Sequence, residues 1–385
     1  MKIGFDAKRA FQNDTGLGNY SRTLLLSLVK RFPANQYFLF APKLTEKFKI
    51  NDIQQFIAVE PIQWLHRKFR GTWRRKWVID ELIKNKIDLY HGLSHRIPKG
   101  IRETKIPAVV TIHDLIFERF PYQYSLADRL IYRSQFKYAC KNSKAIIAIS
   151  EQTKQDLIKF YKTPAQKITV CYQSCDSIFR ERVSEEEKKK IRALYTLPEK
   201  YFLYVGSIIE RKNLLLICKA LLLLKEKSSI PLLVIGRGGK YKKLVQDFID
   251  KNNLQKSIIF LSENEEAKNN PSFKDSTHFP AFYQMAEALI YPSIFEGFGI
   301  PILEALCSGI PVLSSNASCL PEVGGDAACY FNPANENELA EAMLRITTNK
   351  DLRDTMIKKG FQQAELFNEN KTANAVMDVY KKILN

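Results

Sequence analysis

The alternation of short apolar runs with helix-like segments constrains the fold of this 385-residue chain more than any other feature. Such runs predict buried strands, and strands that alternate with helices favour a parallel, doubly wound α/β sheet. Six runs occupy the first half of the chain, at residues 2–7, 37–42, 87–92, 108–114, 145–150 and 168–173. Five more follow, at residues 201–207, 232–236, 257–262, 288–293 and 310–315. Because one hydrophobic core rarely grows this large, we expect two α/β domains.

Polar segments mark the boundaries between these elements. The charged segment at residues 180–200 predicts a linker with a short helix, so that the domains join near residues 174–198. The irregular segment at residues 263–280 predicts an exposed loop insertion. The chain ends in an amphipathic helix, "NKTANAVMDVYKKILN", whose apolar face is expected to cap a domain.

The chain carries 59 Lys and Arg against 41 Asp and Glu, a net charge of +18. This excess indicates an anionic partner, namely nucleic acid, a phosphorylated ligand or an acidic membrane, although a general bias toward lysine would account for part of it. The opening "MKIGFDAKRA" leaves no room for the apolar core of a signal peptide, and no charge-free run approaches the length of a spanning helix. Seven scattered cysteines without a CxxC spacing indicate reduced thiols in a cytoplasmic protein, without a zinc site or a disulfide framework.

The segment "YPSIFEGFGIPILEALCSG", residues 291–309, predicts a ligand site. A strand that ends at Pro292 leads through a glycine-containing loop to a helix that starts near Pro301, a position that proline favours. Free N–H groups at such a helix start attract anions, and Gly297 and Gly299 let a ligand approach the backbone closely. We therefore expect a phosphate here, at the carboxyl end of a parallel strand.

Two carboxylates flank this predicted phosphate site. Because a carboxylate repels a phosphate, we expect Glu296 and Glu304 to accept hydrogen bonds from hydroxyl groups on its two sides. A sugar, a phosphate and a ribose in this order describe a nucleotide sugar. The alternative for Glu304 is an acid in the first turn that stabilises its own helix.

Arg211 and Lys212 follow the predicted strand at residues 201–207. A departing nucleoside diphosphate accumulates negative charge, which either a metal ion or fixed cations must stabilise. The chain contains no D-x-D pair of the kind that metal-dependent transferases use, so we expect no metal and assign the role to these two cations. The alternative is a pair of solvated loop residues in a basic chain.

His113 lies at the carboxyl end of the predicted strand at residues 108–114, next to Asp114. This position favours a ligand-facing histidine, with Asp114 either orienting the ring or beginning a turn. The alternative is a capping or core histidine.

The segment "WLHRKFRGTWRRKW", residues 64–77, holds all three tryptophans of the chain and no acidic residue. Tryptophans mixed with cations are typical of a segment that lies on an anionic membrane. The alternatives are a solvated helix with buried tryptophans and a nucleic-acid patch. The expected membrane contacts are Trp64, Arg67, Lys68, Arg70, Trp73, Arg74, Arg75, Lys76 and Trp77.

Six motifs in order resemble those of family-four retaining glycosyltransferases, which have the GT-B fold of two facing Rossmann-like domains with a cleft between them. "EGFGIPILEA" is similar to the E-x7-E motif of that family, and "YVGSIIERKN" to its G-x-x-x-x-R-K-N loop. "TGLGNYSRTLL", "TIHDLIFERFPYQYS", "AIIAISEQTKQDL" and "SCLPEVGGDAACYFNP" are similar to four further motifs. The bacterial mannosyltransferase B-like branch, which builds cell-surface polysaccharides, resembles this chain most. The long 263–280 segment and "FNEN" before the final helix, where the family commonly has "SW", depart from the pattern.

The resemblance implies a role for each matching residue. Glu296 would contact hydroxyls of the donor sugar, Glu304 would hold the ribose, and His113 would lie near the transferring sugar. Arg211 and Lys212 would neutralise the diphosphate. The resemblance thus implies His113, Arg211, Lys212 and Glu296 as catalytic residues. The implied donor-binding residues are Gly16, Gly18, Gly206, Ser207, Arg211, Lys212, Glu296, Gly297, Phe298, Gly299, Ile300 and Glu304.

The resemblance also implies the domain limits and the reaction. Residues 1–175 with a returning helix at about 366–385 would form an acceptor-side domain, and residues 195–365 would bind the nucleotide sugar. The expected reaction moves a hexose to a polyprenyl-linked or oligosaccharide acceptor at the inner face of the cytoplasmic membrane, with no cofactor. The expected donor is GDP-mannose, with a UDP-sugar as the alternative. Competing interpretations are a nucleotide-sugar epimerase, a basic nucleic-acid-binding protein and a sugar-binding protein.

Overall fold

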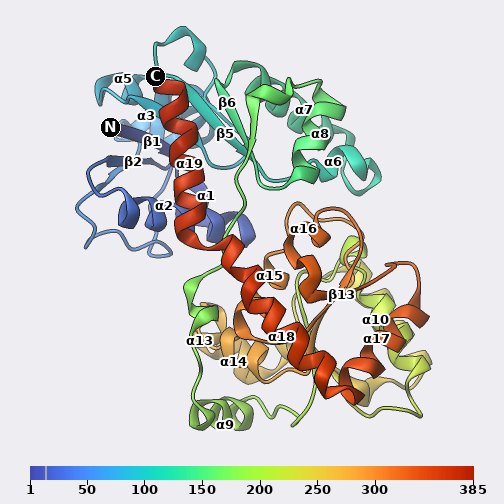
Figure 1. Cartoon of the computed structure of the whole chain (residues 1–385). Helices are drawn as coiled ribbons and strands as arrows, with labels where there is room; N and C mark the ends of the chain where they lie inside the picture. Colours follow the sequence, from blue (N-terminus) through green and yellow to red (C-terminus); the bar gives the residue numbers. More distant parts are fainter. Residues whose placement is uncertain (14) are drawn as a thin grey trace. The chain divides into compact units, whose positions relative to one another are not determined.

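Every apolar run that the sequence analysis assigns to a strand forms one in the computed structural model, which describes residues 1–13 and 15–385. The chain divides into two units: unit 1 comprises Met1–Ser174 and Phe367–Asn385, and unit 2 comprises Cys175–Leu366. Figure 1 shows the chain returning to the N-terminal elements in its last helix. Each unit contains one wholly parallel sheet, so the predicted α/β class with two doubly wound, Rossmann-like domains is confirmed.

Unit 1 has a seven-stranded sheet in the order β3-β2-β1-β4-β5-β6-β7. The strands are β1 Lys2–Asp6, β2 Gln36–Phe40, β3 Phe56–Val59, β4 Leu89–Gly92, β5 Ala108–Ile112, β6 Ala145–Ala148 and β7 Ile168–Val170. The helices are α1 Lys8–Gln12, α2 Gly16–Arg31, α3 Trp64–Lys68, α4 Arg70–Thr72, the π-helical turn η1 Trp73–Trp77, α5 Val78–Lys84, α6 Ile116–Arg119, α7 Leu126–Asn142, α8 Glu151–Tyr161 and α19 Glu369–Leu384.

Unit 2 has a six-stranded sheet in the order β10-β9-β8-β11-β12-β13. The strands are β8 Phe202–Val205, β9 Leu232–Ile235, β10 Ile258–Phe260, β11 Ala288–Tyr291, β12 Val312–Ser315 and β13 Ala328–Phe331. The helices are α9 Glu185–Leu194, the 3-10 turn η6 Glu210–Lys212, α10 Leu214–Leu223, α11 Lys240–Lys251, α12 Glu265–Asn269, α13 Pro271–Lys274, α14 Phe279–Gln284, α15 Ile300–Ser308, α16 Leu320–Gly324, α17 Glu336–Thr348 and α18 Lys350–Ala364.

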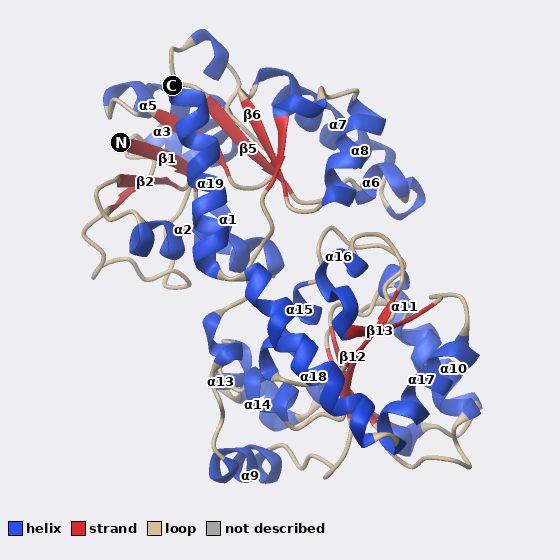
Figure 2. Cartoon of the chain, viewed as in Figure 1, coloured by secondary structure: helices blue, strands red, loops and turns tan. Residues whose placement is uncertain are grey.

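Both faces of the unit 1 sheet are buried, which explains why its strands read as continuous apolar runs. In β2, Tyr37 and Leu39 join the core cluster beneath α2 and α19, whereas Phe38 and Phe40 join the cluster on the opposite face, beneath α5 and α7. In Figure 2, helices lie around the strands of each unit, and α19 crosses the strands of unit 1.

Each sheet has one point at which its strand order reverses, between β1 and β4 in unit 1 and between β8 and β11 in unit 2. Loops from the two neighbouring strands leave in opposite directions at such a point. Open α/β sheets bind their ligands in the resulting crevice, at the carboxyl ends of the strands.

Two local expectations are wrong. The 263–280 segment is not an irregular loop, because Asn264 and Asn270 cap the short helices α12 and α13, and Phe273 of α13 is buried among aromatic rings. The composition of "NDTGLG", residues 13–18, predicts a loop, but Gly16 and Gly18 belong to the first turn of α2. Asp14, within the same predicted loop, is outside the described residues.

Candidate active site

The turn after β8 places two cations at the switch point of unit 2. Gly206 begins this turn with φ +154°, and a Cβ atom on it would lie only 3.1 Å from Cδ of Lys212. The absence of a side chain therefore lets the Lys212 stem lie against the backbone. Ser207 follows, and its carbonyl accepts a hydrogen bond from the Tyr204 hydroxyl at 3.1 Å.

Asn213 fixes this turn to the neighbouring strand ends. It adopts the left-handed φ of 56°, and its side-chain amide donates to the carbonyls of Pro292 at 3.3 Å and Pro333 at 2.8 Å. The Ile294 amide donates in turn to the carbonyl of Arg211 at 2.8 Å. The loops that follow β8 and β11 are thus held as one rigid piece.

Arg211, Lys212 and Glu296 meet in a buried ion cluster. The Arg211 Nη1 and the Lys212 Nζ each lie 2.9 Å from the same Oε1 of Glu296. Arg211 also donates to the Phe295 carbonyl, and Lys212 donates to the Tyr291 hydroxyl at 3.0 Å. Burial opposes ionisation of Glu296, but Lys212 and then Arg211 outweigh it and lower the pKa of this carboxyl to about 2. Two cations face one carboxylate, so the cluster keeps a net positive charge.

The loop between Glu296 and α15 is held from a distant part of the chain. The Glu296 amide donates to the Ser318 hydroxyl at 3.0 Å, and the Cys319 thiol lies 3.1 Å from the carbonyls of Glu296 and Phe298. Gly297 lies within this loop, and the Phe298 side chain is buried. The backbone of the predicted donor-binding segment is therefore fixed before any ligand arrives.

Helix α15 starts at Ile300, one residue before the predicted Pro301, which occupies its first turn. Gly299 precedes it with φ +112°, a conformation that residues with side chains rarely adopt. The Glu304 carboxylate, further along α15, accepts a hydrogen bond from the Tyr283 hydroxyl at 2.6 Å. Burial raises the pKa of Glu304 to about 7.

His113, Gly16 and Gly18 are the predicted site residues that belong to unit 1. His113 follows β5 and is 5% exposed; its Nε2 donates to the Leu93 carbonyl at 2.8 Å. Burial and then His95 lower the pKa of His113 to about 3, so its ring is neutral. Gly18 is required because a Cβ atom there would lie 2.0 Å from the carbonyl oxygen of Asn13, whereas one on Gly16 would meet nothing within 4 Å.

Sequence reasoning missed several residues that shape the site. Tyr291, Tyr283 and Ser318 contact predicted site residues, yet no local pattern marks them. The glycine-rich string "GRGG", residues 236–239, follows β9 and is a sequence signal for a close approach of two backbone segments. A Cβ atom on Gly236 would lie 1.9 Å from the Gly206 carbonyl oxygen, so the loops after β8 and β9 also touch.

The tryptophan-rich segment divides into exposed and buried parts. Trp64 is 73% exposed, and Arg67, Lys68, Arg70, Arg75 and Lys76 are also exposed. Trp73 is fully buried, Trp77 is half-buried, and Arg74 forms a two-pronged ion pair with Asp6. The structure therefore does not support Trp73 and Arg74 as membrane contacts. Glycine tends to break helices, but the helix in this segment is interrupted at Phe69, and Gly71 lies within α4.

The described residues hold neither a membrane-spanning helix nor a metal-binding cluster. No helix among residues 1–13 and 15–385 is both long and apolar enough to cross a bilayer. The same residues contain no cluster of three or more histidine, cysteine or acidic side chains placed to hold a metal ion.

Known proteins with similar sequences are glycosyltransferases. O-antigen chain mannosyltransferase B of Escherichia coli is 25% identical over 402 aligned residues, which cover 99% of this chain and 100% of that protein. O-antigen chain mannosyltransferase RfbU of Salmonella typhimurium is 30% identical over 66% of this chain and 63% of its own length. An Escherichia coli UDP-Gal:alpha-D-GlcNAc-diphosphoundecaprenol alpha-1,3-galactosyltransferase is 25% identical over 59% of this chain and 57% of its own.

Solved structures agree on the fold. The structure of Anabaena HepE in complex with UDP and glucose matches with a TM-score of 0.72 over 99% of each chain, at 16% identity. The family model for Glycosyltransferase Family 4 matches residues 15–177, and that for glycosyl transferases group 1 matches residues 185–363. Together the two family models span nearly all of the two units, and the chain therefore belongs to the family-four, group 1 glycosyltransferases of the GT-B fold.

Proposed function

We propose that this glycosyltransferase moves mannose, with retention of configuration and without a metal ion, from GDP-mannose to a lipid-linked or oligosaccharide acceptor in the synthesis of a cell-surface polysaccharide. The observation that carries the proposal is the cluster of Arg211, Lys212 and Glu296 at the switch point of unit 2. It offers fixed positive charge where an open α/β sheet binds its ligand.

The cluster suits a departing diphosphate. Arg211 offers a planar fork of donors and Lys212 a compact charge. Glu296 holds both before the substrate binds, and Tyr291 also holds Lys212. Negative charge that develops on the leaving oxygens meets hydrogen-bond donors that are already in place, and this preorganisation lowers the activation barrier. The N-terminus of α15 adds free backbone N–H groups beside Gly299.

Retention then follows from attack on the face that the diphosphate leaves. An acceptor hydroxyl attacks the anomeric carbon as the bond to the diphosphate oxygen breaks, and that oxygen takes the hydroxyl proton. Glu296 accepts hydrogen bonds from the donor sugar and Glu304 from the ribose. We propose that His113 contributes to sugar transfer as a neutral ring, since its low pKa excludes a proton-donating role near pH 7.

The donor assignment rests on relatives. The two O-antigen relatives are named as mannosyltransferases, which favours GDP-mannose, whereas the HepE structure contains UDP, which keeps a UDP-sugar as the alternative. A thermal-shift panel of GDP-, UDP-, ADP- and dTDP-sugars decides between them, because a bound donor raises the melting temperature. Stabilisation by GDP-mannose alone is the expected result, and stabilisation by none of the donors would contradict the proposal.

Stereochemistry and metal use are tested on the purified enzyme. Proton NMR of the first product should show an axial anomeric bond, as in the donor, and turnover should persist in excess chelator. Product of inverted configuration, or activity that chelator abolishes and manganese restores, would overturn the corresponding part of the proposal.

We further propose that α3 lies on the anionic inner face of the cytoplasmic membrane. Ile62, Trp64 and Phe69 are exposed apolar side chains, at 71%, 73% and 47%, and Arg67, Lys68 and Lys76 are exposed among or beside them. Apolar insertion combined with cations that bind acidic headgroups is the usual basis of interfacial attachment, and each cation near the surface contributes about 1 kcal/mol.

Flotation with anionic liposomes tests this attachment. Trp64→Ser with Lys68→Glu and Lys76→Glu should abolish flotation, whereas Leu126→Ser, at an equally exposed leucine of α7, should not. Unchanged flotation of the triple variant would remove α3 from the membrane interface.

A further inference from the structure

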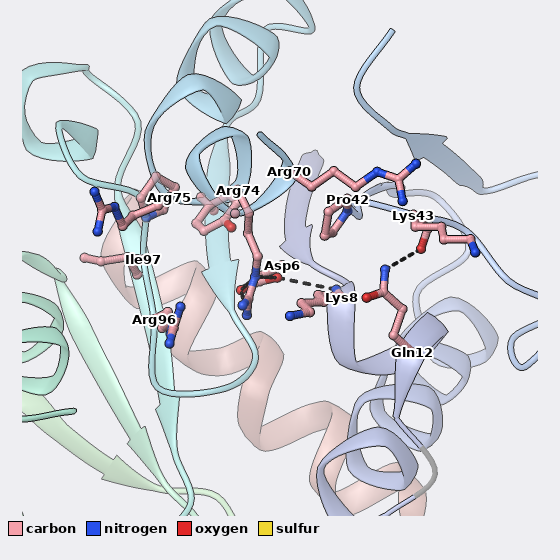
Figure 3. A pocket seen from close by; sticks show the side chains of 13 residues that line it. Asp6, Lys8, Gln12, Pro42, Lys43, Arg70, Arg74, Arg75, Arg96 and Ile97 are labelled. Atoms are coloured by element: carbon pink, nitrogen blue, oxygen red, sulfur yellow. Dashed lines mark hydrogen bonds and ion pairs between the residues drawn. The ribbon is translucent and has the colours of Figure 1, made fainter. Parts of the chain in front are cut away.

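Unit 1 has a pocket at its own switch point. It lies at the carboxyl ends of β1, β2 and β4, where Asp6, Pro42 and Arg96 line it, and its cavity volume is about 210 Å³. Figure 3 shows Arg74 reaching down to Asp6 in its centre, with Lys8 beside them and Arg96 opposite. Open α/β sheets bind ligands at the carboxyl ends of the strands beside a switch point, so this position alone predicts a ligand site.

The charged side chains that line this pocket are almost all positive. Its cations are Lys8, Lys43, Arg70, Arg74, Arg75 and Arg96, and its one carboxylate is Asp6. Asp6 is already occupied, because Arg74 Nε donates to Oδ1 at 2.8 Å and Arg74 Nη2 to Oδ2 at 2.5 Å. Among the residues that the structure describes, none of the other five cations forms an ion pair. Five of the six cations therefore have no carboxylate partner within the pocket.

This lack of counter-charge is costly for the free protein. Burial and then the charge of Arg74 lower the pKa values of Lys8 and Arg96, and Arg9 lowers both further. The Arg9 Nε is also buried without a hydrogen-bond partner among the described residues. An anion with several negative charges would relieve this repulsion and meet charge-assisted hydrogen bonds.

The surroundings indicate what carries the anion. A second hollow shares Arg70, Gly71, Arg75 and Arg96 with the pocket and adds Lys68, Phe69 and Gln135. The basic pocket is thus continuous with the exposed apolar side of α3. Its volume of about 210 Å³ lies below the roughly 300 Å³ at which drug-sized sites begin, so it holds a compact anion rather than a whole glycolipid.

We propose that this pocket binds the diphosphate of a lipid-linked acceptor, and that the lipid chain extends from the pocket along α3. The proposal rests on the proposed function and names the acceptor's chemical class, and it assigns Arg70, Arg74 and Arg75 to ligand binding rather than to the membrane surface. One relative is named for a diphosphoundecaprenol-linked acceptor, which agrees with this chemistry.

Calorimetric titration of the full chain tests the proposal with three probes: farnesyl diphosphate, farnesyl monophosphate and inorganic pyrophosphate. All titrations use the Lys212→Met background, so that the cluster of unit 2 does not capture the probe. We expect farnesyl diphosphate to bind most tightly and Lys8→Gln with Arg96→Gln to weaken it at least tenfold. The matched control, Lys99→Gln with Lys105→Gln, removes two exposed cations of unit 1 that do not line the pocket and should leave the affinity unchanged.

Each other outcome has a defined meaning. Equal affinity for farnesyl diphosphate and pyrophosphate would assign the pocket to a soluble diphosphate and overturn the lipid-linked source. Equal weakening by the two double variants would overturn the site itself. Lys8→Arg with Arg96→Lys should restore binding if the charge matters.

The donor panel separates this proposal from the proposed function. The pocket variants, with Lys212 intact, should keep the thermal shift that the nucleotide sugar produces, which also shows that they fold. Loss of farnesyl diphosphate binding with a normal donor shift supports the pocket. A protein that no donor stabilises, but that still binds farnesyl diphosphate through Lys8 and Arg96, would remove the proposed function and keep the pocket.

Discussion

Lys212 is positioned for its charge, because its ammonium group contacts Glu296 and the Tyr291 hydroxyl beside a glycine that makes room for its stem. Replacement by methionine removes the charge and keeps most of the volume, and Arg211 still pairs with Glu296. We expect Lys212→Met to lower kcat by about 10²–10³, since one preorganised donor for developing negative charge is lost. Steady-state kinetics against Lys243→Met, at an exposed residue of α11, measures the effect; a near-normal kcat would contradict the leaving-group role.

We expect Glu304 to lose its proton when the nucleotide binds, which makes proton release a measure of binding at this residue. Burial raises its pKa to about 7, so the free protein is partly protonated at that pH. Ribose hydroxyls that donate to the carboxylate stabilise its charged form, lower its pKa and release about half a proton at pH 7. Calorimetry in two buffers of different ionisation enthalpy measures the release, and affinity should fall as the pH drops below 7.

Glu304→Gln provides the control for this proton release. It should abolish the release that Glu304 contributes and weaken nucleoside-diphosphate binding by about 1–3 kcal/mol, because a hydrogen bond to a charged group is lost. Protons from the diphosphate itself are common to both proteins and cancel in the comparison. The same release from both proteins would exclude Glu304 from the ribose site.

The start of α15 depends on one backbone conformation. Gly299 has φ +112°, and a Cβ atom there would lie 2.9 Å from Cδ2 of Leu320. Gly299→Ala should therefore cost about 1–3 kcal/mol of unfolding free energy in urea and weaken nucleotide binding, since the helix start moves. Gly16→Ala, at a helical position with open space, should be neutral or stabilising. Equal unfolding free energies for the two variants would show that Gly299 is not strained.

The sequence analysis missed two short strands at sheet edges. β3 and β13 are the outermost strands of their sheets, and although their sequences FIAV and ACYF are apolar, each has three half-buried residues among its four. The helices in 263–280 were missed because asparagine caps, rather than an apolar period, define them.

The candidate site was predictable where its residues lie in recognisable loop motifs. Arg211 and Lys212 lie in the turn after β8, and Glu296 lies in the loop after β11. Tyr283 and Ser318 could not be found, because only the folded sheet brings them to Glu304 and Glu296. Within residues 64–77, composition could not separate Arg74, which pairs with Asp6, from its exposed neighbours, since the interruption at Phe69 and the π-helical turn set which side chains turn inward.

At the scale of the whole molecule, unit 1 is built from both ends of the chain. Ala373, Val376, Met377 and Tyr380 of α19 are buried in the core cluster that includes Leu24 of α2. The Tyr380 hydroxyl lies 2.6 Å from the His91 Nδ1, whose other ring nitrogen lies 2.8 Å from the Thr111 hydroxyl. The last helix therefore closes a core that the first 174 residues cannot complete.

Truncation after Leu366 should unfold or loosen unit 1 and spare unit 2. It removes several buried apolar side chains, each contributing about 1.5–3 kcal/mol, and leaves the His91 ring without its Tyr380 partner. Hydrogen exchange of the truncated chain should show lost protection in β1, β2 and β4, while amides of β8 and β11 stay protected and gain further protection with the nucleotide. Full protection of β1 and β4 would show that residues 1–174 fold without α19, and lost protection in β8 would show that unit 2 depends on unit 1.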